Sequence, residues 1–295
     1  HDALPISYYT TGSASDSEFD ADGQLTSAIN QITTDVSKKI YYTTGHGETT
    51  LSTSLSDELE KSSVTTEELN LLMVEEIPSD CDLILIDAPT SDISEQEETM
   101  LLNYMSEGGK VIYVMGDAST ETPNLNAFME QYGMTKTDGY IADMQRCYQG
   151  NYYYIFPEIS ASGDLGDGLE SDMVLLVNSA GFTVQEDLRD TLSVTQVMTT
   201  SSEGYAVTEE AQTQGEYTLA AVAEEDDAKL TVIASESMIN SRITEYFSNL
   251  DNSRLFLNLV MNNFDDVENL SIKAKSLSVE LNTVQHAGSI STRSE

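Results

Sequence analysis

The sequence has few basic residues and no tryptophan. Its thirteen lysines and arginines stand against fifty-one aspartates and glutamates, so the formal net charge is −38. The acidic residues are spread along the chain, with a local cluster at Glu224-Glu-Asp-Asp227. Binding to nucleic-acid phosphates or to anionic lipid is strongly disfavoured by this charge, so nucleic acid is excluded as a partner. We interpret the charge first as that of a solvated, self-repelling surface and second as a surface that binds cations.

Cysteine and long apolar runs are also scarce. The two cysteines, Cys81 and Cys147, form no CxxC or other metal-binding spacing, which excludes a disulfide framework and a structural zinc site. A single bridge between them is left open. No run approaches the roughly 20 apolar residues of a membrane helix, and no secretion signal is seen. Taken literally, these absences indicate a cytosolic protein.

The two ends of the sequence do not look native. The segment His1-Asp-Ala-Leu-Pro-Ile6 resembles one translated frame of a short-read sequencing adapter, and Arg293-Ser-Glu295 resembles its reverse complement. We expect residues 1–7 and 293–295 to be artefacts and the chain between them to be a fragment of a longer, metagenomic reading frame. Such segments are left out of fold reasoning, and the absence of membrane segments then carries little weight.

Strand and helix signals alternate in two parts of the chain, 20–140 and 222–268, which predicts one α/β domain. Strands separated by helices of this length require parallel crossover connections. The run 82–87 is continuously apolar, as in parallel strands covered on both faces. The pattern predicts strands at 38–44, 66–74, 82–87, 110–115 and 230–234, and helices or helical spacing at 25–36, 51–59, 94–109, 123–132, 239–247 and 255–264.

The intervening segment, 141–221, is β-rich, with polar, glycine-containing breaks. We predict strands at 152–156, 173–177, 194–198 and 217–222, either within the same unit or as a small subdomain. The aromatic strand 152–156 is of a kind that stacks on sugars, but a place in a core or an interface is favoured. Residues 269–292 have the composition of a linker.

The most informative motif is Gly45-His-Gly-Glu48, which directly follows the first predicted strand. In α/β proteins, the turn from a strand to a helix is where sites are found. Gly45 and Gly47 permit positive φ or close backbone approach, and the imidazole of His46 can titrate or coordinate. Glu48 is expected in the first turn of the following helix, where a carboxylate suits the helix dipole.

Further polar residues follow other predicted strands. Because the carboxyl ends of parallel strands lie along one edge of a sheet, we expect these residues to share a crevice that binds a small molecule or an ion. Three of the carboxylates have the chemistry of acids, bases or cation ligands. The alternative is that they cap helices and form turns. The candidate set is Gly45, His46, Gly47, Glu48, Asp87, Asp117, Ser235 and Glu236.

Motifs of covalent and cofactor chemistry are missing. No nucleophile elbow follows a predicted strand, and the turn after residue 114 presents Asp117 where a serine or cysteine would stand. There is no P-loop, and Gly45-His-Gly47 lacks the third glycine of a dinucleotide-binding loop. With His286 in the tail, His46 has no second histidine nearby for a transition metal. We therefore predict no catalytic residue, no bound metal and no cofactor.

Several stretches together resemble a known family. They are Gln24–Ile29, Lys39–Glu48, Asp82–Pro89, Ser94–Gly109 and Asn258–Asn263, and they look like the extracytoplasmic part of gliding-motility-type (Gldg family) ABC-transporter auxiliary proteins. The resemblance extends over most of residues 20–285 and is clearest at Gly45–Glu48. It implies a flavodoxin-like fold, similar to class I glutamine amidotransferases without their nucleophile. That fold has a mostly parallel sheet flanked by helices, here with a β-rich middle insertion.

The resemblance also implies a role. We expect a non-enzymatic, extracytoplasmic accessory domain of a bacterial ABC transport system, contacting the permease and working beside the ATPase. Membrane helices outside this fragment, beyond the linker 269–292, would anchor it at the cell membrane. The second hypothesis is an amidotransferase-like or hydrolase-like enzyme that uses His46 with Glu48 or Asp87. The third is a free solute- or carbohydrate-binding protein. Homo- and hetero-oligomers are both left open.

Overall fold

The computed structural model describes residues 6–11, 14–19, 37–171, 173–244, 246–247, 249–264 and 275–276, with side chains only between 37 and 264. The predicted helix 25–36 and all but two residues of the predicted linker 269–292 lie outside these ranges. Near the ends of the chain, β1 (Ile6–Thr11), β2 (Ala14–Phe19) and β19 (Lys275–Ser276) form a small antiparallel sheet.

The core of the molecule is a ten-stranded sheet in which five neighbouring strands are parallel. Antiparallel strands extend it on the β18 side, whereas β4 forms its other edge. The α/β class predicted from the alternating pattern is therefore confirmed. The parallel strands, in spatial order, are β4 (Val64–Leu69), β3 (Lys38–Thr43), β5 (Leu83–Asp87), β6 (Lys110–Val114) and β18 (Ala228–Ile233). The antiparallel strands are β17 (Thr218–Glu225), β14 (Leu192–Thr199), β11 (Glu158–Ile159), β13 (Phe182–Val184) and β7 (Met134–Lys136).

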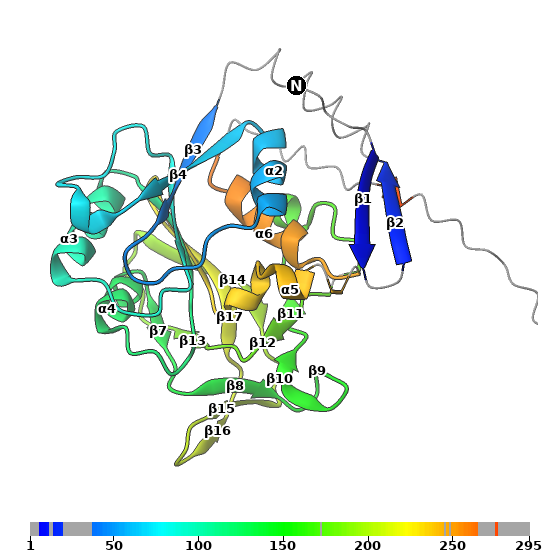
Figure 1. Ribbon diagram of the computed structural model, residues 1–295. Coiled ribbons are helices and arrows are strands. Elements are labelled where there is room, and N and C mark those ends of the chain that lie inside the picture. Colours follow the sequence, from blue (N-terminus) through cyan, green and yellow to red (C-terminus); the bar gives the residue numbers. More distant parts are fainter. Residues whose placement is uncertain are drawn as a thin grey trace, which may run out of the picture.

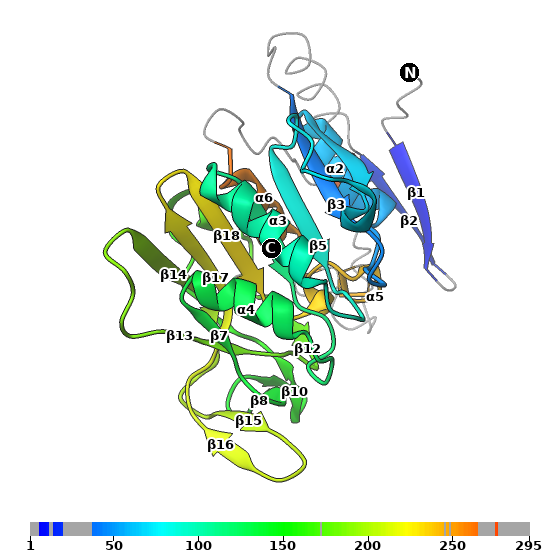
Figure 2. The same cartoon turned by 90° about the vertical axis from the view of Figure 1, so that its left-hand side faces the viewer.

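Helices cover both faces of the parallel strands. From β3 the chain crosses through α2 (Thr53–Lys61) to β4, whereas α3 (Glu95–Ser106) connects β5 to β6 in the opposite direction along the sheet. Because such crossovers are right-handed, α2 and α3 must lie on opposite faces. Figures 1 and 2 show α3 and α4 (Pro123–Gln131) together on one face and α6 (Asn252–Met261) on the other.

Segment 141–221 contributes both to the main sheet and to two smaller sheets. Strands β14 and β17 pair with each other within the main sheet. One small sheet comprises β8 (Tyr140–Asp143), β15 (Gly204–Val207) and β16 (Gln212–Gln214), and the other β9 (Cys147–Tyr148), β10 (Asn151–Ile155) and β12 (Leu176–Val177). The predicted strand 173–177 is shorter than expected. The reason is that the side chain of Asn252 bonds both the N–H and the carbonyl of Leu175 and so replaces a neighbouring strand.

Two other predicted elements differ from the helices and strands of the structure in their bounds. The predicted strand 66–74 stops at Leu69, since Asn70 accepts the N–H of Leu72 and starts the 3-10 helix η1 (Leu71–Met73). Within the predicted helix 239–247 the structure has α5 (Ser241–Thr244), and the 3-10 helix η3 (Glu236–Met238) precedes it. Short polar side chains compete with regular structure in this way.

The structure also bears on the cysteines and on membrane-crossing segments. Cys81 and Cys147 are both free thiols, so the bridge left open above is not formed. Within the described residues, no helix has the length and apolar character needed to cross a membrane.

Candidate functional site

The Gly45–Glu48 motif forms the loop that leaves β3. Gly45 has φ +119° and Gly47 has φ +75°, both in the region that favours glycine. A Cβ atom on Gly47 would lie 2.0 Å from Oγ1 of Thr90, in the next strand-to-helix turn. The prediction that these glycines permit positive φ and close approach is therefore confirmed, and Gly47 brings two neighbouring loops into contact.

Glu48 lies in this loop and not in a helix, so its predicted place in a first helical turn is wrong. The following helix, α2, begins only at Thr53, because Ser52 is its N-cap and accepts the N–H of Leu55. Glu48 instead turns back and accepts the backbone N–H of His46 through Oε2 at 2.7 Å. The Glu48 carboxylate thus stabilises the turn that contains it.

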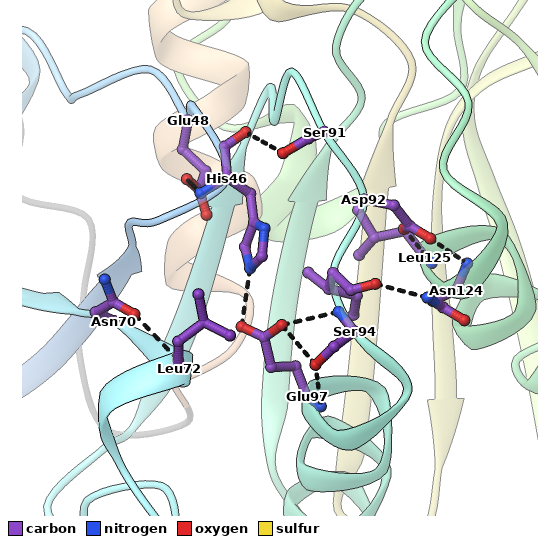
Figure 3. Close-up of polar contacts among 11 residues, drawn as sticks. His46, Glu48, Asn70, Leu72, Ser91, Asp92, Ser94, Glu97, Asn124 and Leu125 are labelled. Atoms are coloured by element: carbon purple, nitrogen blue, oxygen red, sulfur yellow. Dashed lines mark hydrogen bonds and ion pairs between the residues drawn. The ribbon is translucent and has the colours of Figure 1, made fainter.

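The imidazole of His46 points to the start of α3, where it meets Glu97 (Figure 3). Nε2 of His46 lies 2.8 Å from Oε1 of Glu97, and these side chains are 10% and 2% exposed. Glu97 also forms a capping box with Ser94, as the sequence predicts. Burial raises the pKa of Glu97, but hydrogen bonds from His46 and Ser94 outweigh burial and leave that pKa lowered.

The backbone of His46 strengthens this connection. Its carbonyl accepts the N–H groups of Thr90 and Ser91 at 2.9 and 3.1 Å, and their hydroxyl groups at 3.2 Å. No hydroxyl or thiol group hydrogen-bonds the imidazole within the described part of the chain. The contacts of His46 therefore join the loops after β3 and β5, and they place no nucleophile at its ring.

Asp87, the last residue of β5, is in a different environment. Its side chain is buried, with a residue exposure of 2%, and neither carboxylate oxygen has a hydrogen-bond partner. Burial, followed by the negative charges of Glu236 and Glu48, raises the pKa of Asp87 to about 8. The Asp87 carbonyl accepts the N–H of Thr49 at 2.8 Å, which holds the Glu48 loop against the end of β5.

The side chains of Asp117 and Ser235 are hydrogen-bonded to other residues of the protein. Oδ1 of Asp117 accepts the N–H and the hydroxyl of Ser119 and, at 2.7 Å, the hydroxyl of Tyr140. Hydrogen bonding from Ser119 is the main reason why the pKa of Asp117 is lowered, although burial opposes it. Ser235 caps η3 through Ser237, and the two hydroxyl oxygens lie 2.7 Å apart. Both residues thus have the cap and turn roles named above as the alternative.

The structure places all the candidate residues at or just beyond the carboxyl ends of β3, β5, β6 and β18, but their contacts divide them into separate groups. His46 contacts α3, Asp117 contacts the residues next to it and β8, and Asp87 shares its surroundings with Glu48 and Glu236. Within the part of the chain that the structure describes, no group of three or more His, Cys, Asp or Glu residues is placed to hold a metal ion. The single crevice expected from the sequence is therefore not what the contacts show.

A tight crevice, with no room for a water molecule, lies beside Asp117, between the loops after β5 and β6. Lys136 lines it and donates to the carbonyl of Thr120 at 2.9 Å. Burial lowers the pKa of Lys136, and nearby carboxylates oppose that shift. Sequence reasoning missed Lys136 because the short strand β7 that carries it was not predicted.

Comparison with protein families gives a match for one part of the chain. Residues 37–152 match the family model described as an ABC-type uncharacterized transport system. The matched segment runs from β3 to β10 and includes the Gly45–Glu48 motif, Asp87 and Glu97. This part of the chain is therefore similar to the auxiliary component of such a transport system. The predicted resemblance is confirmed at this level, and its narrower gliding-motility type stays a prediction.

Solved structures show the same fold at low sequence identity. The mmIFT52 N-terminal domain is 17% identical with a TM-score of 0.58, covering 77% of this chain and 98% of that one. A cytoplasmic protein from Salmonella typhimurium LT2 is 11% identical with a TM-score of 0.50, covering 76% and 98%. No curated protein sequence gives a significant match.

Proposed function

We propose that this chain is a non-enzymatic accessory domain of a membrane ABC transport system, placed on the extracytoplasmic side and in contact with the permease. The observation that carries this proposal is the match of residues 37–152 to the transport-system family. The proposal includes the gliding-motility type of the family and a membrane attachment through segments outside this sequence. In this proposal the domain is associated with the ATPase indirectly, through the permease.

The contacts of the Gly45–Glu48 motif support a non-enzymatic role. The ring of His46 hydrogen-bonds Glu97, and Glu48 accepts a backbone N–H, so the predicted acid and base do not face each other. A nucleophilic mechanism needs a hydroxyl or thiol within hydrogen-bond reach of the base. The enzyme hypothesis, with His46 paired to Glu48 or Asp87, is therefore less well supported than a structural use of the same residues.

An exposed apolar pair supports a contact surface within the matched segment. Leu72 and Met73 are 57% and 80% exposed, and they lie in η1, directly after the edge strand β4. Among the described strands, β4 pairs only with β3. Exposed apolar groups beside a free sheet edge are typical of protein contacts. We assign the permease contact to this edge.

Site-specific photocrosslinking in native membranes tests the assignment. A crosslinking amino acid at Met73 of the full-length protein is expected to give a covalent adduct with the permease. The matched control carries it at the exposed residue Glu209, in the turn between β15 and β16 at the far end of the molecule (Figure 1). The surface assignment is wrong if both positions give the same adducts. Absence of permease adducts from either position counts against the permease contact itself.

A further inference from the structure

The carboxyl group of Asp87 is the buried polar group that the proposed function leaves unexplained. The residue is 2% exposed, and neither oxygen finds a hydrogen-bond donor. Buried polar groups are normally paired, and an unpaired one indicates a missing partner such as an ion or a water molecule. Protonation would remove the charge of Asp87, but both oxygens would still lack a partner.

The groups around Asp87 add negative charge. Oε1 of Glu48 is also buried without a hydrogen-bond partner, and Glu236 acts on Asp87 from the start of η3. The bond from Thr49 N–H to the Asp87 carbonyl keeps the Glu48 loop close to the end of β5. In the described residues, no lysine, arginine or histidine side chain pairs with any of these three carboxylates, and His46 is engaged with Glu97. A cation from solution would supply the positive charge that these three carboxylates lack among the described side chains.

We propose that Asp87 and Glu48 bind a hard divalent cation of the Mg²⁺ and Ca²⁺ class, with Glu236 at the outer side. All donors are carboxylate oxygens, which suit these ions and not the softer transition metals. Mg²⁺ is often bound through only one or two protein carboxylates, so a third protein ligand is not required. The ion would tie the loop after β3 to the end of β5. This site goes beyond the proposed function and does not depend on it.

Cation titration of the protein as expressed, after removal of bound metal with a chelator, tests the site. MgCl₂ and CaCl₂ are added separately, and the melting temperature is followed by circular dichroism and binding by calorimetry. About 150 mM NaCl screens diffuse attraction to the strongly acidic surface. The variants are Asp87→Asn, Glu48→Gln and, as a matched control, Glu130→Gln, which removes an exposed carboxylate from α4.

The proposal predicts saturable binding and a higher melting temperature for the wild-type protein with at least one of the two ions. Asp87→Asn and Glu48→Gln should each lose about tenfold or more in affinity, whereas Glu130→Gln should bind like the wild type. If Asp87→Asn does not fold, Glu48→Gln decides the outcome. The proposal is overturned if neither ion binds, or if the folded site variants bind as tightly as the control.

Discussion

Nε2 of His46 lies 2.8 Å from Oε1 of Glu97, so the histidine of the Gly45–Glu48 motif binds the first turn of α3. The same histidine holds Thr90 and Ser91 through its carbonyl. Two strand-to-helix loops, which are separate in sequence, are joined by this one residue. The motif therefore has a clear structural use within the segment that matches the transport-system family.

Replacing the histidine should destabilise the fold. His46→Ala leaves the buried carboxylate of Glu97 without its strongest side-chain partner, and a hydrogen bond to a charged group is typically worth about 1.5–3 kcal/mol. We expect a loss of that size in the free energy of unfolding, measured by urea denaturation with circular dichroism. Glu95→Gln, an exposed change in the same turn of α3, should stay within about 0.5 kcal/mol of the wild type. Equal stability of His46→Ala and the wild type would contradict the structural role.

Gly47 should not tolerate a side chain. In Gly47→Ala the new Cβ would clash with Oγ1 of Thr90, and the residue would also keep a positive φ. Gly150→Ala is the matched control, because Gly150 has φ +79° and nothing within 4 Å of the added atom. We expect the control to lose about 1–2 kcal/mol through φ alone, and Gly47→Ala to lose clearly more. If the two variants have the same free energy of unfolding, the close approach of Gly47 to Thr90 does not contribute to stability.

The pKa of Asp87 predicts how stability changes with pH. The folded value of about 8 lies above the ordinary value of 3.8, so the folded protein holds a proton that the unfolded chain releases between these values. The stabilisation from this group is complete below the unfolded pKa and is lost as pH rises through the folded pKa. Asp87→Asn stays neutral, so its stability relative to the wild type should rise between about pH 5 and pH 9.

Urea denaturation of both proteins across that pH range, with a chelator present to exclude bound cations, measures the difference. The two proteins differ only in the carboxyl or amide group at position 87. The effect of pH on the rest of the acidic surface is therefore the same in both, and it cancels in the difference between their free energies of unfolding. Parallel pH profiles for the wild type and Asp87→Asn would show that Asp87 is not held in its neutral form.

The cysteines offer a chemical test of the packing. Burial is the main cause that raises the pKa of the Cys81 thiol to about 11, although a hydrogen bond with Tyr104 opposes it. Because the thiolate is the reactive form, Cys81 of the folded protein should be alkylated slowly near pH 8 and faster as pH rises. Mass spectrometry after timed alkylation measures this. In denaturant without reductant both thiols should react, and a single reactive thiol or none would contradict the free state of the two cysteines.

The sequence was sufficient to predict the parallel strands and the helix α3. Continuous apolar runs at 82–87 and 110–115, and the capping box at Ser94 and Glu97, are local signals that tertiary contacts did not override. The predicted strand 173–177 is shortened to β12 because a side chain of α6, Asn252, takes the place of a neighbouring strand at Leu175. Such a contact joins residues 77 positions apart and leaves no local pattern.

The sequence predicted where the candidate residues lie, but not which groups they hydrogen-bond. The rule that parallel strands end at one edge correctly located Asp87, Asp117 and Glu236. It could not show that Glu97, recognisable as a helix cap, would also bind His46, since that pairing depends on how α3 is set against the loop after β3. Nor could it show that Glu48 would bend back to its own turn.

Copurification tests the central claim most directly. The full-length protein, tagged and solubilised from its native membranes in mild detergent, is captured, and the bound proteins are identified by mass spectrometry. Capture of the same protein after the membranes are stripped of peripheral proteins serves as a control for loose association. We expect an ABC permease and its ATPase to be recovered with the tagged protein in reproducible amounts. Recovery of the tagged protein without a permease or an ATPase would contradict its assignment as an accessory domain of a transport system.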